Sequence, residues 1–182
     1  GYEFIITHAN DARGINVALM YLPYRFRPFV KDTLRIAPPA GHKPRQTRDV
    51  LHVAGQVTSG DTLDVIVCHL PSQRGGRPAQ HYRLSVAKAM RHLVDSLAAM
   101  RQHPQIVITG DFNTSYPSAV FDEGLHVCLP HTASAHAANT NQLYLLTHNM
   151  KGRNDVAGTY KYQGEWSQLD HFIVNAPLLH AT

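Results

Sequence analysis

Apolar and polar positions in the first seventy residues repeat in short runs that are typical of β-strands. Turn-forming residues separate five runs rich in apolar and β-branched side chains, at Tyr2–Thr7, Ile15–Tyr21, Phe29–Ile36, Asp49–Val57 and Thr62–Leu70. The second and fifth runs are almost entirely apolar, which predicts strands buried on both faces. We therefore expect five strands before any helix.

The following segment has the period of a helix. Apolar side chains recur at spacings of three and four, which predicts a helix from about Tyr82 to Arg101 that ends near Pro104. Its stripe consists of Leu84, Ala87, Met90, Val94, Leu97 and Ala98. Such a helix is expected to cover one face of a sheet.

The rest of the chain mixes short elements of both kinds. The pattern predicts strands at Gln105–Thr109, Gln142–Leu146 and Gln168–Asn175, a short helix at Ser118–Glu123, and a loop at His131–Thr140. Hairpins followed by a helix and further strands favour an α+β fold, an α/β sandwich of mixed sheets, over a regular alternation of strand and helix.

Composition narrows the class of protein and its partners. With 182 residues, of which 43% are hydrophobic and 16% charged, the chain is expected to form one domain over residues 1–182. Its 17 Lys and Arg exceed 13 Asp and Glu, which favours an anionic partner such as a phosphate ester. Cys68 and Cys128 either pair or remain separate thiols.

The sequence contains no run of 18 apolar residues that would suggest a membrane span. The chain begins Gly-Tyr-Glu without an initiator Met, so we expect that it was cut from something longer. Export and compartment, and the oligomeric state, stay open.

The stretch "GDFN" places polar groups at the end of an apolar strand. Asp111 and Asn113 follow Gly110, where the chain leaves the predicted strand. A carboxylate there suits taking a proton from water or holding a hard cation, and an amide suits donation to an anionic oxygen. An Asx turn, in which these side chains only cap their own backbone, is the alternative.

A second strand end carries a similar set of groups in "IVCHLPSQRGG". His69 ends the apolar run, and Pro71, Ser72, Arg74 and two glycines follow it. They supply a rigid turn, a hydroxyl, a guanidinium and an open backbone that suit a bound phosphate. Ser72 and Arg74 are therefore candidate substrate-binding residues. A single His at a strand end is more often a structural group, so the neighbours of His69 carry this hypothesis.

Four stretches in this order, "ARGINVALMY", "VCHLPSQRGG", "VITGDFNTSYPS" and "GTYKYQGEWSQLDHFIV", span nearly the whole chain. Their order and wording resemble the endonuclease/exonuclease/phosphatase superfamily, in particular a bacterial branch. The resemblance implies a fold like that of pancreatic deoxyribonuclease, a four-layer α/β sandwich with two packed mixed β-sheets, here incomplete. It also implies Mg²⁺ or Mn²⁺ as cofactor and a phosphate ester as substrate, with nucleic acid among the candidates.

The resemblance implies a role for each matching residue. Asp111 would orient or deprotonate the attacking water, and Asn113 would help to hold the water and the scissile phosphate; both are candidate metal ligands. His69 would donate to a non-bridging phosphate oxygen. Asp170 matches the aspartate that supports the general histidine of these enzymes, and Arg13 is a candidate phosphate ligand.

Two features of the family have no match in the sequence. A metal-binding Glu is expected well upstream of "RGINVALMY", but only twelve residues precede Arg13, and Glu3 lies in the wrong place. The terminal Ser-Asp-His-x-Pro motif, whose His is the central catalytic one, has no counterpart after Asn175. The chain therefore holds about half of the expected apparatus and is expected to be a fragment.

Asp170-His171 is a rival candidate for that terminal pair. The following Phe172-Ile173 lacks the proline, which favours the penultimate strand. Neighbours on a strand point to opposite faces, so Asp170 and His171 cannot both face one site without a bulge. We expect Asp170 to face the site and His171 to be structural.

These observations favour a fragment of a Mg²⁺-dependent phosphoesterase that acts by in-line attack of water, either a nuclease or a phosphatase. The alternative is a non-catalytic phosphate- or nucleic-acid-binding module on the same fold, which also explains the missing Glu and His. A purely structural β-sandwich leaves the four ordered motifs as coincidence.

Overall fold

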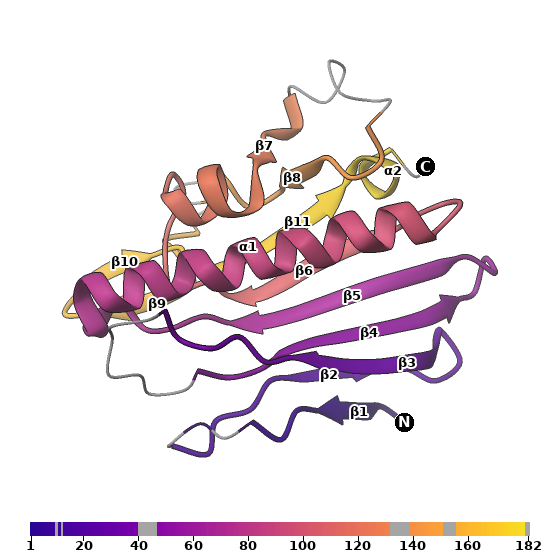
Figure 1. The fold of residues 1–182 in the computed structure, drawn as a ribbon, viewed down its shortest axis with the longest axis horizontal. Helices are drawn as coiled ribbons and strands as arrows, with labels where there is room; N and C mark the ends of the chain where they lie inside the picture. Colours follow the sequence, from indigo (N-terminus) through magenta and orange to yellow (C-terminus); the bar gives the residue numbers. More distant parts are fainter. Residues whose placement is uncertain (10, 12, 40–46, 132–138, 151–155, 181–182) are drawn as a thin grey trace.

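The computed structural model describes residues 1–9, 11, 13–39, 47–131, 139–150 and 156–180. Its centre is a mixed sheet of seven strands in the order β3-β4-β5-β6-β11-β8-β7 (Figure 1). The pairs β5·β6 and β7·β8 are parallel and the others antiparallel. The strands are β3 (Phe26–Leu34), β4 (Val50–Val57), β5 (Thr62–His69), β6 (Ile106–Asp111), β7 (Val127–Cys128), β8 (Leu143–Leu145) and β11 (Asp170–Asn175).

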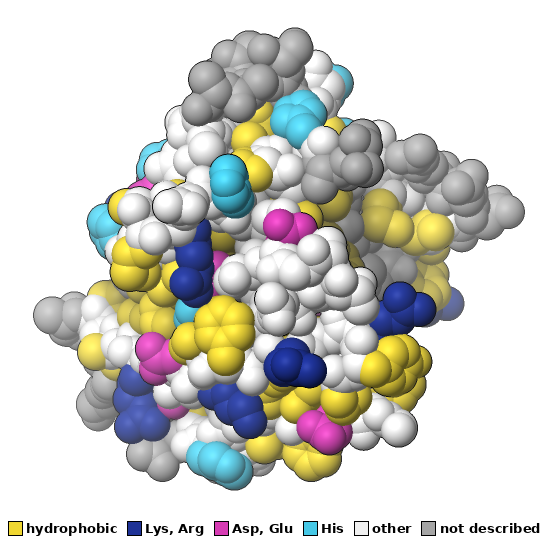
Figure 2. Space-filling view, turned by 90° about the vertical axis from the view of Figure 1, so that its right-hand side faces the viewer, with side chains coloured by type: hydrophobic (Ala, Val, Ile, Leu, Met, Phe, Trp, Pro, Cys, Tyr) yellow, Lys and Arg dark blue, Asp and Glu magenta, His cyan; other side chains and the backbone are white. Residues whose placement is uncertain are grey.

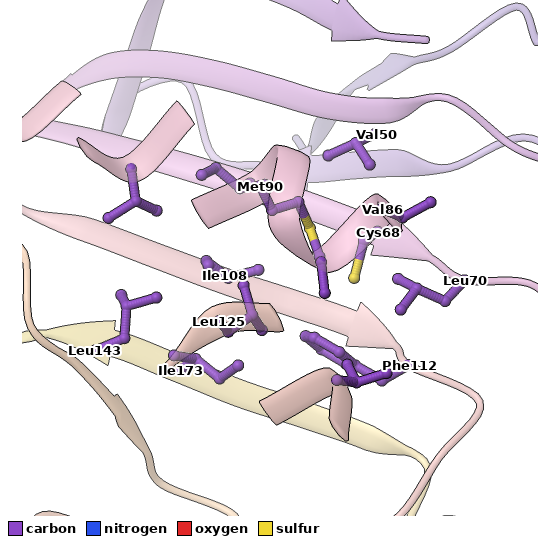
Figure 3. Packing of buried hydrophobic residues seen from close by; sticks show 14 of the residues in the cluster. Val50, Cys68, Leu70, Val86, Met90, Ile108, Phe112, Leu125, Leu143 and Ile173 are labelled. Carbon is purple, nitrogen blue, oxygen red and sulfur yellow. The ribbon is translucent and has the colours of Figure 1, made fainter. Parts of the chain in front are cut away.

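One long helix, α1 (Gly76–Met100), covers one face of this sheet (Figure 1). Its Val86 and Met90 pack on apolar side chains of β5 and β6 such as Cys68 and Ile108 (Figure 3). The helix begins at Gly76, earlier than the sequence predicted. The cause is that Pro78 lies in the first turn, where a helix loses nothing by the missing N–H.

A ribbon of two antiparallel strands, β1 (Glu3–Ile6) and β2 (Ala18–Tyr21), packs on the other face. Ile5 and Val17 pack there with side chains of the large sheet that include Leu51 and Val53. The expectation that Ile15–Tyr21 is buried on both faces was wrong, since Met20 is 67% exposed. Only one face of this ribbon meets the large sheet.

The α+β class and the sandwich are confirmed. In the described part of the chain the second sheet has two antiparallel strands, so it is not itself mixed. The predicted short helix is present as one wide turn, η2 (Val120–Leu125), and a second short helix, α2 (Ala176–Leu179), follows β11. Residues 132–138 of the predicted loop lie outside the described residues.

Four further features bear on function. A hairpin that the sequence did not predict, β9 (Tyr160–Tyr162) with β10 (Glu165–Ser167), lies beside the start of α1 (Figure 1). Cys68 and Cys128 are both free thiols. No helix among the described residues is long and apolar enough to cross a membrane. Figure 2 looks onto the end of the sheet that lies away from the start of α1, where acidic and basic side chains are interspersed.

Candidate active site

Three strand ends meet at one edge of the large sheet. His69 is the last residue of β5, Asp111 the last of β6 and Asp170 the first of β11. In register, Asp111 is the Cα partner of both His69 and Asp170. Side chains at paired positions of neighbouring strands point to the same face. The three side chains therefore share one face, at the edge toward which the arrows of β5 and β6 point in Figure 1.

The imidazole of His69 and the carboxylate of Asp111 are in direct reach of each other. His69 Nε2 lies 3.4 Å from Asp111 Oδ2, and the two side chains are 26% and 31% exposed. The resemblance implied that both residues act on one phosphate, and the structure brings their strand ends together. Their catalytic roles stay predictions.

The local structure of "GDFN" explains why a glycine precedes the carboxylate. Gly110 has φ +135°, and a Cβ atom there would lie 2.0 Å from the backbone oxygen of Cys68. Phe112, the next residue but one, is fully buried and packs on Phe121. Only a glycine therefore lets β6 approach β5 closely enough at this point for Asp111 to face His69.

The Asx turn that stood as an alternative is present as well. The N–H of Asn113, which has φ +49°, donates to Asp111 Oδ1 at 2.7 Å. Asn113 Nδ2 donates to the carbonyl of Leu70 at 2.9 Å, which ties this turn to the end of β5. Asp111 Oδ2 still faces His69, so the turn orients the carboxylate and does not consume it.

A buried arginine that the sequence reasoning missed completes the cluster. Arg48 is 5% exposed and donates from Nη2 to His69 Nε2 at 2.6 Å. Its Nε lies 4.0 Å from Asp11 Oδ2 and has no hydrogen-bond partner among the described residues. A signal was available: β4 and β5 form a hairpin, so Arg48, two residues before β4, is expected beside the end of β5.

Burial and charge set the protonation of these groups. Burial lowers the pKa of His69 to about 4, and the charges of Arg48 and Arg13 act in the same direction. Because an arginine only donates, the neutral ring accepts at Nε2 and carries its proton on Nδ1. Burial raises the pKa of Asp111, as does the nearby Asp170. The contact of His69 with Asp111 is thus between a neutral ring and a carboxylate.

The other predicted site residues differ in position. Arg13 lies beside the cluster, with Nε 3.6 Å from Asp11 Oδ1. Ser72 Oγ accepts from Arg74 N–H at 3.4 Å and caps η1 (Gln73–Gly75), and Arg74 lies over the ring of Tyr162. In the described part of the chain, neither Ser72 nor Arg74 forms a hydrogen bond or an ion pair with His69 or Asp111.

His171 points away from this face, as the alternation predicted. It is 1% exposed, and Nδ1 lies 2.8 Å from Thr147 Oγ1 while Nε2 lies 3.1 Å from the carbonyl of Thr114. Its ring also meets Phe112 and Phe121 edge to face. Asp170, by contrast, is exposed.

The oxygen donors at this edge suit a hard cation. In the part of the chain that the structure describes, no three His, Cys, Asp or Glu side chains form a metal cluster. Asp111 and Asp170 are nevertheless adjacent carboxylates, and the amide of Asn113 follows. Mg²⁺ keeps several waters and takes only one or two protein carboxylates together with substrate phosphates. This donor set fits Mg²⁺ or Mn²⁺ without forming a closed cage.

Comparisons with known proteins agree on family and fold. A family model described as "Endonuclease/Exonuclease/phosphatase family" matches residues 1–182. Human Nocturnin catalytic domain superposes with a TM-score of 0.61 at 14% identity, over 96% of this chain and 61% of that one. TDP2 from Caenorhabditis elegans gives 0.65 at 13%, over 97% and 62%.

A mannosyl-6-phosphatase from Bacteroides thetaiotaomicron gives a TM-score of 0.61 at 15% identity, over 96% of this chain and 63% of that one. This chain therefore spans less than two thirds of these structures. At these identities the likeness concerns the fold. A search of curated protein sequences finds no match.

Proposed function

The chain belongs to the endonuclease/exonuclease/phosphatase family, and we propose that it carries part of the active site of a divalent-metal-dependent phosphoesterase. The reaction is hydrolysis of a phosphodiester or phosphomonoester by in-line attack of water. The observation that carries this proposal is the meeting of His69, Asp111 and Asp170 on one face of three adjacent strand ends.

Asp111 is the proposed acceptor of the proton from the attacking water. A base works best when its pKa lies near the working pH, and burial together with Asp170 raises the pKa of Asp111. The N–H of Asn113 donates a hydrogen bond of 2.7 Å to Asp111 Oδ1 and so fixes this oxygen in place. The carboxylate is thereby held in one orientation, with Oδ2 free to accept.

His69 is the proposed donor to a non-bridging phosphoryl oxygen. Arg48 occupies Nε2, so the donated proton is the one on Nδ1. The positive charges of Arg48 and Arg13 lie beside this ring and favour an anionic substrate. When bound by Asp111 and Asn113, with Asp170 as a supporting carboxylate beside them, Mg²⁺ would supply further positive charge against the phosphoryl oxygens.

The test is an assay of the gene product that contains residues 1–182. We expect release of phosphate or alcohol from at least one member of a panel of phosphodiesters and phosphomonoesters. Activity should need Mg²⁺ or Mn²⁺ and stop with EDTA. Asp111→Asn keeps the shape and removes the base, so turnover should fall by about 10²- to 10⁴-fold.

Asp61→Asn is the matched control, because Asp61 is exposed in the β4–β5 turn at the opposite end of the sheet. Its turnover should equal that of the unmodified protein. Full activity of folded Asp111→Asn would contradict the proposal. Phosphate-ester binding without any hydrolysis would instead favour the non-catalytic binding module.

A further inference from the structure

The hairpin β9–β10 exposes aromatic rings beside the candidate site. Tyr160, Tyr162 and Trp166 are 44%, 49% and 39% exposed. The rings of Tyr160 and Tyr162 are parallel within 12°, with centroids 6.3 Å apart. An aromatic ring that lies outside the core keeps a large apolar area exposed to water, and a ligand that covers this area would gain binding free energy. Tyr160 and Tyr162 are two residues apart on β9 and therefore point to the same face, which indicates a binding surface there.

Two cations accompany these rings. The guanidinium carbon of Arg74 lies 5.5 Å from the centroid of Tyr162, and Lys161 Nζ lies 5.5 Å from that of Trp166. Neither Arg74 nor Lys161 has an ion pair with any residue that the structure describes. Glu165, the Cα partner of Tyr162, is the one acid within the hairpin strands. Neighbours on a strand point to opposite faces, so Tyr160, Tyr162 and Glu165 share one face of the hairpin, whereas Lys161 and Trp166 lie on the other. The tyrosine face therefore combines two parallel rings with the guanidinium of Arg74.

Hydrogen bonds between one side chain and the backbone tie the hairpin to the site. Thr159 Oγ1, just before β9, accepts from Leu169 N–H at 3.0 Å and from Asp170 N–H at 3.1 Å. Ser167, the Cα partner of Tyr160, is three residues from Asp170, a span of at most about 11 Å. Arg74 comes from the turn that follows His69. The rings thus lie within reach of a group attached to a phosphate at the site.

We propose that the hairpin β9–β10 binds a nucleobase of a single-stranded nucleotide chain whose phosphate lies at His69 and Asp111. This inference rests on the proposed function and names its substrate class. Stacking of a base on an aromatic ring tolerates any sequence, and a nearby arginine or lysine binds the next phosphate. A duplex buries its bases in its own stack, so the hairpin selects unpaired strands.

The test is binding in EDTA, where no hydrolysis occurs, so it is independent of turnover. A fluorescent single-stranded oligonucleotide is titrated into the gene product at one low salt concentration. The loss of one base–aromatic contact should raise Kd for Tyr162→Leu by about 5- to 140-fold. Tyr162→Phe keeps the ring and should bind like the unmodified protein.

Tyr24→Leu is the matched control. Tyr24 is 69% exposed and also lies below an arginine, with Arg25 Cζ 5.7 Å from its centroid, but at the opposite end of the sheet. Its Kd should not change. An abasic oligonucleotide of the same length should bind more weakly, and Tyr162→Leu should not affect that binding.

Three outcomes overturn the inference. The first is equal binding of the normal and abasic strands. The second is an unchanged Kd for folded Tyr162→Leu. The third is a Tyr162-dependent affinity for a hexose phosphate and none for the oligonucleotide, which assigns the rings to a sugar. Base-dependent binding by a protein that hydrolyses nothing would support the hairpin and contradict only the proposed function.

Discussion

Strand β5 has a cluster of charged and polar side chains at each end, and the two clusters differ in how completely their hydrogen bonds are satisfied. At its start, the fully buried Asp64 accepts from His52 Nε2 at 2.9 Å and from Arg101 Nε and Nη2 at 3.1 Å each. At its end, Arg48 Nε has no hydrogen-bond partner in the described structure, and Asp111 lies beside another carboxylate.

This difference separates a structural role from a functional one. A buried charge whose hydrogen bonds are all made stabilises the fold and has nothing left to offer a ligand. A cluster with like charges side by side and an unused donor costs stability until an anion or a cation joins it. The cluster around Asp64 therefore fastens the end of α1 to the sheet, whereas the cluster around His69 is suited to binding.

The largest effect is expected at the satisfied cluster. Asp64→Ala leaves His52 and Arg101 without their acceptor, and the loss of one partner of a buried charge pair costs about 3–5 kcal/mol of unfolding free energy. Urea denaturation followed by circular dichroism measures it, with the exposed Asp32→Ala as control. Turnover per folded molecule should not change. A loss below 1 kcal/mol would mean that this cluster does little for the fold.

The next effect compares two neighbours on β11. Asp170→Ala should lower turnover by about 10- to 100-fold, the usual cost of losing a supporting carboxylate. His171→Ala removes a buried ring and should lower the unfolding free energy by about 2–4 kcal/mol. Its turnover per folded molecule should stay the same. If both folded variants are equally inactive, "LDHF" is the terminal Asp-His motif.

The smallest effect is a pH dependence. In the unfolded chain the pKa of His69 is near its ordinary value. In the folded protein it is lowered to about 4, chiefly by burial and secondly by the positive charge of Arg48. Between these values the unfolded chain binds more protons, so unfolding free energy should fall as pH falls toward 4. NMR of the metal-free protein should show a neutral His69 ring above pH of about 5. Arg48→Met should move its titration upward, and titration near 6.5 in the unmodified protein would contradict the assignment.

Local periodicity was enough to predict most of the fold. The strands and the stripe of α1 follow from side chains that alternate or recur within a few residues, such as Ala87, Met90 and Val94, which are all buried. The exposure of Met20 could not be predicted, because it depends on what covers the outer face of β2. Apolar composition alone does not say how many layers a strand has around it.

The site was predicted in part for the same reason. Three of the site residues end or begin an apolar run, and this position in the sequence predicted that they lie at strand ends: His69, Asp111 and Asp170. Arg48 joins the cluster through the pairing of β4 with β5, which the short turn between the two predicted strands indicated but which no motif at Arg48 itself showed. The hairpin β9–β10 has strands of three residues, too short for a periodic signal. Gln163 and Gly164, with φ +49° and +89°, form the two-residue turn that gave the available clue.

The contact of Gly110 with the Cys68 carbonyl also limits how the protein can vary. Any side chain at position 110 must push β6 away from β5 at the level of His69 and Asp111. A substitution of His69 or Asp111 leaves the spacing of β5 and β6 intact, so a related protein can lose catalysis and keep the fold. A change at position 110 alters the gap into which both groups point. Gly110 therefore sets the distance between β5 and β6 at the site. Among related chains we expect it to be conserved more often than His69 or Asp111.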